Sequence, residues 1–212
     1  LWVPLSYLPQ TVVEWAWGAV LAAASVAILV GLAWLRRPAA WAIALIIAPW
    51  LLSLVQVGNI QPLVVAVLAF GISRRSGPIW IGIAASLKLA PLAFALVYLA
   101  RREWLRFLGS GAVAAILLAP ALLYDLSGYS TDPGRSFSLY YYMSPAAWLA
   151  AAAASSLLAF VLAVRRSPYV WVAAAVAVML LPPRTHVTYA TFLVVGLIGG
   201  LGDRIERRPE RG

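Results

Sequence analysis

The sequence contains no cysteine and a single histidine, and only 11% of its 212 residues are charged. The absence of cysteine excludes disulfides and thiol chemistry. Soluble domains carry about 25% charged residues, so this chain has less than half of the usual solubilising charge. Because small soluble folds bury only about two thirds of their surface, a water-soluble protein of this size could not hide a composition that is 64% hydrophobic. We therefore expect a protein of the lipid bilayer.

Long apolar runs predict the fold class. A membrane-spanning helix needs about 20 apolar residues to cross a hydrocarbon core of about 30 Å. The runs cover residues 12–35, 39–57, 60–73, 78–87, 89–100, 104–123, 145–164, 168–181 and 187–201, with a polar loop over 124–144. They predict an all-α, polytopic transmembrane bundle of about 7–9 helices, some short or broken. The length suits one bundle, so we expect residues 1–212 to form a single transmembrane domain.

The basic residues are paired at the ends of these runs, and the net charge is +9. The pairs are Arg36–Arg37, Arg74–Arg75, Arg101–Arg102 and Arg165–Arg166, followed by the basic tail 204–211. This is the pattern of cytoplasmic loops in membrane proteins, and it does not resemble a nucleic-acid patch. With the pairs in the cytoplasm, thirteen of the sixteen Lys and Arg residues lie on that side, and Lys88, Arg135 and Arg184 do not.

Residues 76–102 have an Arg pair at each end, and a single straight helix would place one pair on the wrong side of the membrane. A hairpin of two short helices, 78–87 and 89–100, removes this conflict if the chain breaks near Lys88 and Pro91. Irregular backbone at membrane depth is tolerated only where it is buried in protein or lines a wet cavity. The break therefore predicts a site.

Lys88 is the only lysine, and it stands in the middle of this apolar run. An ionisable group inside a bilayer costs about 2.5–3.5 kcal/mol on insertion scales and is usually functional. One interpretation is a cation that meets a phosphate or another anionic group in the membrane. The other is a lysine that extends from a short helix to the interface, with no ligand.

Three amides, those of Gln56, Asn59 and Gln61, surround a predicted turn between two runs. Gly58 permits a tight turn, and Pro62 can open the following helix. The amides could bind sugar hydroxyls, or they could satisfy the backbone at the ends of a broken helix. Spacing alone leaves both interpretations open.

The last external turn is predicted at 182–186, where His186 lies two residues after Arg184. A histidine beside an arginine suits anion binding or proton transfer, although a lone histidine is often structural. Asp125, Asp132 and Arg135 are expected to be solvated loop residues, and 140–142 to belong to an interfacial aromatic belt. Because the sequence contains no metal-ligand cluster and no phosphate-binding glycine loop, we expect no metal and no cofactor.

Three stretches resemble the polytopic glycosyltransferases of family 87, which are polyprenyl-phosphate-mannose-dependent mannosyltransferases of the GT-C type. The most specific stretch has glycine, lysine and proline at Gly82, Lys88 and Pro91, followed by a basic-Trp boundary at 101–104. Residues 57–62 are similar to the family's Gly-Gln-Val-Asn turn, and 182–186 to a proline…histidine turn. A GT-C-like membrane fold is what this resemblance implies.

The resemblance also implies the reaction: transfer of a sugar, expected to be mannose, from a polyprenyl-phosphate donor to a glycolipid or glycan acceptor. Lys88, Arg184 and His186 would bind the donor phosphate, and His186 is also a candidate catalytic residue. The sugar or acceptor would be bound by Gln56, Asn59 and Gln61. The resemblance further implies a multi-pass protein of the plasma membrane, with its site facing the non-cytoplasmic side.

The family's first external loop normally carries the acidic residue taken as the catalytic base, and nothing here matches it. Glu14 stands in a different sequence context. We therefore expect the chain to be the C-terminal portion of a longer protein whose base lies upstream of residue 1. Two rival functions stay open: a transporter or flippase of a lipid-linked glycan, which would also use broken helices, and a non-catalytic membrane subunit.

Overall fold

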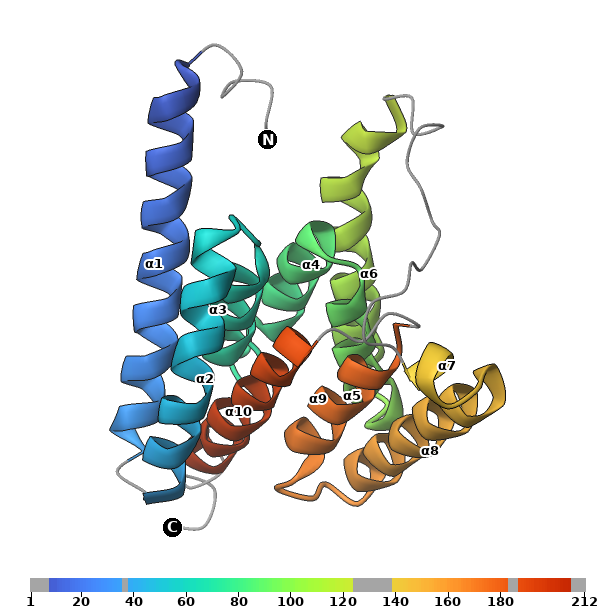
Figure 1. The fold of residues 1–212 in the computed structure, drawn as a ribbon. Helices are drawn as coiled ribbons and strands as arrows, with labels where there is room; N and C mark the ends of the chain where they lie inside the picture. The colour runs from blue at the N-terminus through green and yellow to red at the C-terminus, as the bar shows by residue number, and fades with distance from the viewer. Residues whose placement is uncertain (1–7, 36–37, 124–138, 183–186, 207–212) are drawn as a thin grey trace. The chain divides into compact units, whose positions relative to one another are not determined.

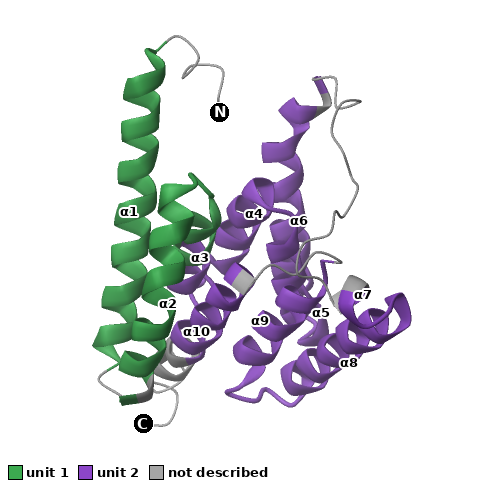
Figure 2. Cartoon of the chain, viewed as in Figure 1, with its two compact units in different colours: residues 1–66 green, residues 67–212 purple. Residues whose placement is uncertain are grey.

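The computed structural model describes residues 8–35, 38–123, 139–182 and 187–206, and these residues form helices and no strand (Figure 1). The all-α prediction is therefore confirmed for the described part of the chain. The chain divides into two compact units, residues 1–66 and 67–212, and each is described by itself (Figure 2). That the whole chain forms a single domain stays a prediction.

Unit 1 contains α1 (Gln10–Trp34), α2 (Pro38–Gln56) and the start of α3 (Gln61–Gly71). α1 packs against α2. Its buried positions follow the helical repeat: Leu21, Ala24, Ser25, Ile28, Gly31 and Leu32. Most of its other apolar side chains are exposed, including Trp15 and Trp34. This is the pattern of a helix that contacts protein on one stripe and lipid elsewhere.

Unit 2 holds the remaining helices. They are α4 (Gly77–Leu87), η2 (Ala90–Ala95), α5 (Leu96–Ala100), α6 (Trp104–Leu118), η3 (Ala119–Leu123), α7 (Leu139–Tyr142), α8 (Pro145–Val164), α9 (Val170–Leu180), η4 (Val187–Thr191) and α10 (Phe192–Glu206). The predicted runs match these helices closely. Two details were wrong: the predicted loop 124–144 ends in the short helix α7, and the last helix continues five residues beyond 201 to Glu206.

Three of the described helices are long and apolar enough to cross a membrane: Gln10–Trp34, Trp104–Ala121 and Pro145–Val164. The other apolar helices have 10–17 residues, including Gly77–Leu87, Ala90–Ala100 and Val170–Leu180. The prediction that some membrane helices are short is confirmed.

The predicted hairpin over 76–102 is confirmed by contacts between its two ends. The Tyr98 hydroxyl donates to the carbonyl of Ile72 at 3.2 Å, although 26 residues separate them in the sequence. The Arg106 guanidinium donates to the carbonyl of Arg74 at 2.9 Å and forms an ion pair with Glu103 at 2.9 Å. The two Arg pairs that flank the hairpin are therefore on the same side, which we call the basic end of unit 2.

A second hairpin, formed by α9, η4 and α10, starts from the same basic end. The Arg101 guanidinium lies 5.8 Å from the ring of Trp171, in the first turn of α9. α10 returns so closely that a Cβ added to Gly196 would lie 2.6 Å from Cα of Val172. Only glycine permits this approach.

The short helices determine where the tips of these hairpins lie. At 1.5 Å per residue, the 11 residues of α4 or of α9 rise about 16 Å, roughly half of a hydrocarbon core of about 30 Å. Because both hairpins start at the basic end, their tips, near Lys88 and Pro182, are expected near mid-depth. α6 and η3 continue further in Figure 1.

Candidate functional site

The break between α4 and η2 falls at Lys88, as predicted. Lys88 has an extended backbone, with φ −156° and ψ 120°, and its N–H still donates to the carbonyl of Ala84 at 3.0 Å. Pro91 stands in the first turn of η2, where its missing N–H costs least. The backbone of Lys88 therefore ends α4, and its side chain extends away from that helix end.

The Lys88 side chain meets an aromatic ring from the second hairpin. Its Nζ lies 4.1 Å from the ring centroid of Tyr189, in η4. A cation held over an aromatic face gains about 0.5–2 kcal/mol, with the larger values at sites shielded from water. Both residues are half-buried. The contact holds the ammonium group at the meeting point of the two hairpin tips.

Sequence reasoning did not identify Tyr189. It stands 101 positions after Lys88, inside a run that was predicted only as a membrane helix. The one available signal was indirect, because a cation at membrane depth needs a partner. Nothing in the sequence distinguished Tyr189 from the other tyrosines as that partner.

A column of aromatic rings supports Tyr189. Its ring centroid lies 5.8 Å from that of Phe192, which lies 6.3 Å from Phe94. Phe94 lies 6.5 Å from Trp171, which meets Tyr98 edge-on at 6.2 Å. Such tilted and edge-on pairs contribute about 0.5–1.5 kcal/mol each beyond their buried area. The column therefore connects Tyr189 to the basic end through buried rings and restricts its movement.

Lys88 and Tyr189 line a cavity of about 660 Å³, which we call the lysine cavity. The other lining residues are apolar: Leu89, Ala90, Leu92, Ala93, Leu96, Phe107, Leu181 and Pro182. Leu89, Leu96 and Leu181 are 67%, 42% and 43% exposed, so the apolar rim of the cavity is open to its surroundings. In a bilayer, an apolar opening of this kind faces lipid.

The turn between α2 and α3 is held by backbone hydrogen bonds and by the side chain of Asn59. Gly58 has φ +66°, and the N–H of Asn59 donates to the carbonyl of Leu54 at 2.9 Å, which together end α2 in a Schellman motif. The Asn59 Oδ1 then accepts from the N–H of Gln61 at 2.9 Å, at the start of α3. Gln61 is completely buried and Gln56 is exposed. Sugar binding by these amides stays a prediction.

The two remaining predicted site residues and the other charged residues of interest divide into two groups. Arg184 and His186 lie outside the described residues, as do Asp125, Asp132 and Arg135. The carboxylates of Glu14 and Glu103 are described: Gln10 donates to the first at 2.7 Å, and Arg106 pairs with the second. Neither lines the lysine cavity. Within the described part of the chain, no group of three or more His, Cys, Asp and Glu residues could hold a metal ion.

This geometry suits a ligand with an anionic group and an apolar chain. One cation lies at one end of a large apolar cavity, and the rim is open on an apolar side. A phosphate could bind Lys88 by charge while an attached lipid chain fills the apolar part. Among the residues that line it, the cavity offers no carboxylate that could take a proton from an acceptor.

Comparison with known proteins now identifies the family. No curated protein and no solved structure matches the chain. The model of glycosyltransferase family 87 matches residues 1–132, which include the whole hairpin that carries Lys88. Tyr189 and the α9 side of the cavity lie beyond the matched residues. Since the match covers more than half of the sequence, this membrane protein belongs to glycosyltransferase family 87.

Proposed function

We propose that this membrane glycosyltransferase transfers mannose from a polyprenyl-phosphate donor to a glycolipid or glycan acceptor on the non-cytoplasmic face of the plasma membrane. The observation that carries the proposal is the lysine cavity, in which a single cation stands at the break of a short membrane hairpin. A lipid-borne phosphate offers both the charge and the apolar chain that such a cavity accepts.

Lys88 has a direct role in the proposed reaction. The acceptor hydroxyl attacks the anomeric carbon, a new C–O bond forms, and the bond from that carbon to the phosphate oxygen breaks. The donor is a phosphodiester with one negative charge, and the leaving polyprenyl phosphate is a monoester with nearly two. Lys88 therefore binds the leaving group more strongly as the reaction proceeds, which is the requirement for lowering the barrier.

Tyr189 acts as a positioning residue in this scheme. Its ring lies over the Lys88 ammonium at 4.1 Å and would hold that group at the cavity wall, where a phosphate could bind it. Arg184 and His186 are proposed as further phosphate ligands, and Gln56, Asn59 and Gln61 as sugar or acceptor ligands, by the family resemblance. The acceptor proton goes to a base that is not among the residues lining the cavity.

The rim of the lysine cavity suggests how the donor enters. Leu89, Leu96 and Leu181 form an exposed apolar border, so a lipid-linked sugar can move in sideways from the bilayer. A water-soluble nucleotide sugar would have to cross the same apolar border with its charged diphosphate, at a cost of several kcal/mol. The site therefore favours lipid-linked over nucleotide-linked donors.

The test compares these two donor classes directly. Membranes that contain the protein receive radiolabelled mannose on polyprenyl phosphate or on a nucleoside diphosphate, with membranes lacking the protein as the control. We expect label in a glycolipid or glycan from the first donor only. Transfer from the nucleotide donor in membranes that cannot form the lipid-linked donor would contradict the proposal, and transfer only from another polyprenyl-phosphate sugar would change the sugar assignment.

A further inference from the structure

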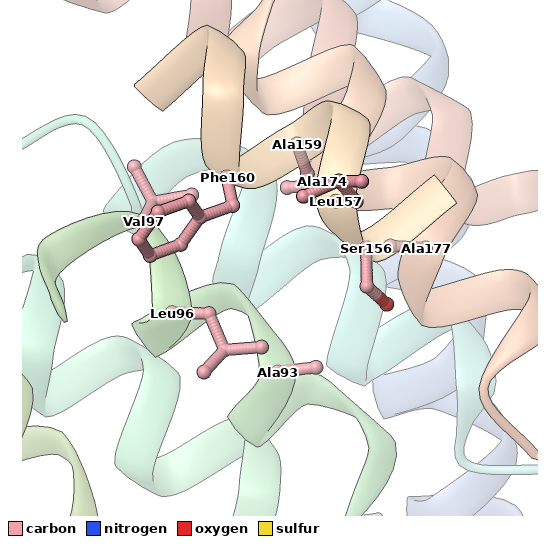
Figure 3. Close-up of a pocket in the computed structure, with 9 residues that line it drawn as sticks. All are labelled: Ala93, Leu96, Val97, Ser156, Leu157, Ala159, Phe160, Ala174 and Ala177. Atoms are coloured by element: carbon pink, nitrogen blue, oxygen red, sulfur yellow. The ribbon is translucent and has the colours of Figure 1, made fainter. Parts of the chain in front are cut away.

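Unit 2 contains a second cavity, of about 330 Å³, among η2, α5, α8 and α9 (Figure 3). Its lining is apolar apart from one hydroxyl: Ala93, Leu96, Val97, Ser156, Leu157, Ala159, Phe160, Ala174 and Ala177. Figure 3 shows Val97 and Phe160 at one end and Ser156 and Ala177 at the other. We call it the alanine cavity.

The two cavities meet at shared residues. Ala93 and Leu96 line both of them, so the alanine cavity adjoins the lysine cavity along η2 and α5. The two cavities together form a path along η2 and α5, and the order of the lining residues in the chain gives its direction. It starts at Lys88, passes Ala93 and Leu96, and ends beside Val97, one turn before the basic end.

Four alanines give the second cavity its width. Ala93, Ala159, Ala174 and Ala177 stand where three helical elements meet, and three of them are less than 9% exposed. Larger side chains at these positions would fill the space. The outer wall, formed by Leu96, Leu157 and Phe160, is 42–64% exposed, so the path runs along the apolar surface of the unit.

We infer that the alanine cavity binds the second and later isoprene units of the lipid donor, whose phosphate lies at Lys88. This inference rests on the proposed function. An apolar cavity that adjoins a cavity lined by a cation suits a chain attached to an anion. An isoprenoid chain carries a methyl branch on every fourth carbon and needs more width than a straight chain, and the alanines provide that width. Phe160 and Val97 close the end of the path.

The test fills the alanine cavity and changes the length of the donor chain. Ser156→Leu places a large side chain in the cavity, and Ser155→Leu is the matched control, because Ser155 is the half-buried neighbour that does not line it. Each variant is assayed in membranes with a long polyprenyl-phosphate mannose and with a donor of one isoprene unit, which ends inside the lysine cavity.

We expect Ser156→Leu to raise KM for the long donor several-fold, because one isoprene unit loses its packing contacts with the cavity walls, with kcat unchanged. KM for the one-unit donor is expected to stay the same, and Ser155→Leu is expected to change neither value. Equal changes for both donors, or for both variants, would overturn the inference.

A second measurement separates this inference from the proposed function, because it does not depend on activity. A polyprenyl phosphate with a photoreactive group on its third isoprene unit should label peptides that contain 93–97 and 156–160, and Ser156→Leu should reduce the labelling. A phospholipid with the same group on its acyl chain should label these peptides no more than other exposed apolar positions. Equal labelling by the two probes would show that the cavity holds bulk lipid, and the inference would fail even if mannose transfer were observed.

Discussion

The turn at 57–60 and the break at Lys88 both interrupt the helical chain at a polar residue, and they use that residue differently. At the turn, the N–H of Asn59 donates to the carbonyl of Leu54 at the end of α2, and its Oδ1 accepts from the N–H of Gln61 at the start of α3, at 2.9 Å each. At the break, the backbone N–H of Lys88 donates to the carbonyl of Ala84, and its ammonium group faces the ring of Tyr189 in a cavity of about 660 Å³.

The difference shows how a polar residue in a membrane helix becomes available for chemistry. Helix ends leave N–H and C=O groups that must find partners, and in a bilayer water does not supply them. An asparagine at a helix end is readily used for that purpose. A lysine has no acceptor and a long side chain, so it cannot cap the start of a helix and its charge must be placed elsewhere.

The largest expected effect is a loss of catalytic activity when Lys88 is replaced, with no comparable loss when Asn59 is replaced. Lys88→Met should lower kcat by about 100- to 1000-fold, the usual cost of removing one donor that stabilises transition-state charge. Folding should be retained, because a methionine fills the same space without a charge at membrane depth. The assay is mannosyl transfer from the lipid donor, with thermal unfolding measured alongside. Comparable loss of activity in Asn59→Ala would remove the contrast between the two positions.

The next largest effect is a loss of stability when Gly58, in the turn at 57–60, is replaced. Gly58→Ala should destabilise the protein by roughly 1–2 kcal/mol, because Gly58 has φ +66° and a residue with a Cβ is strained there. Gly18→Ala is the control: a Cβ at Gly18, inside α1, meets nothing within 4 Å, so stability should rise or stay unchanged. Thermal unfolding in detergent measures both, and the opposite order would contradict the assigned geometry.

A smaller effect is expected at the aromatic partner of Lys88. Tyr189→Leu should lower kcat/KM by roughly 3- to 30-fold, the loss of about 0.5–2 kcal/mol of cation–π interaction. Tyr189→Phe should keep most of the activity, since it keeps the ring. In the Lys88→Met background, Tyr189→Leu should have almost no additional effect on transfer. A full additional loss in that background would show that Tyr189 acts independently of Lys88.

The smallest effect concerns the cap of α3. Asn59→Ala should cost about 1 kcal/mol of stability, the usual cost of losing a side-chain acceptor at a helix start. Asn59→Asp keeps the oxygen and should recover most of that loss. A higher KM for the acceptor in Asn59→Ala would support the proposed role of Asn59 as a sugar ligand, and a loss of stability alone would leave it with the capping role only.

Much of the fold could be predicted from the sequence. Apolar runs and Arg pairs are strong signals in a bilayer, because length and sidedness constrain each helix. The hairpin at 76–102 followed from the Arg pairs alone, and the contact of Arg106 with the carbonyl of Arg74 confirms it. The enzyme class was also identified from sequence, as the family match supports a glycosyltransferase and not a flippase.

The parts of the site that could not be predicted depend on contacts between distant parts of the chain. Tyr189 could not be selected as the partner of Lys88, because nothing local marks one tyrosine among nine. The role of Asn59 could not be decided, because the same amide can cap a helix or bind a sugar. The small helix α7 was missed because four residues, Leu139–Tyr142, form too short a segment to show helical periodicity.

The half-length hairpins have an electrical consequence. A phosphate that binds Lys88 near mid-depth has moved through about half of the membrane voltage, and each elementary charge gains or loses about 2.3 kcal/mol per 100 mV over the full thickness. In the proposed orientation, with the Arg pairs in the cytoplasm, the interior-negative potential would oppose entry of the anion by about 1 kcal/mol per charge at 100 mV. Donor affinity is therefore expected to fall several-fold when proteoliposomes are polarised, although the proposed reaction carries no ion across the membrane.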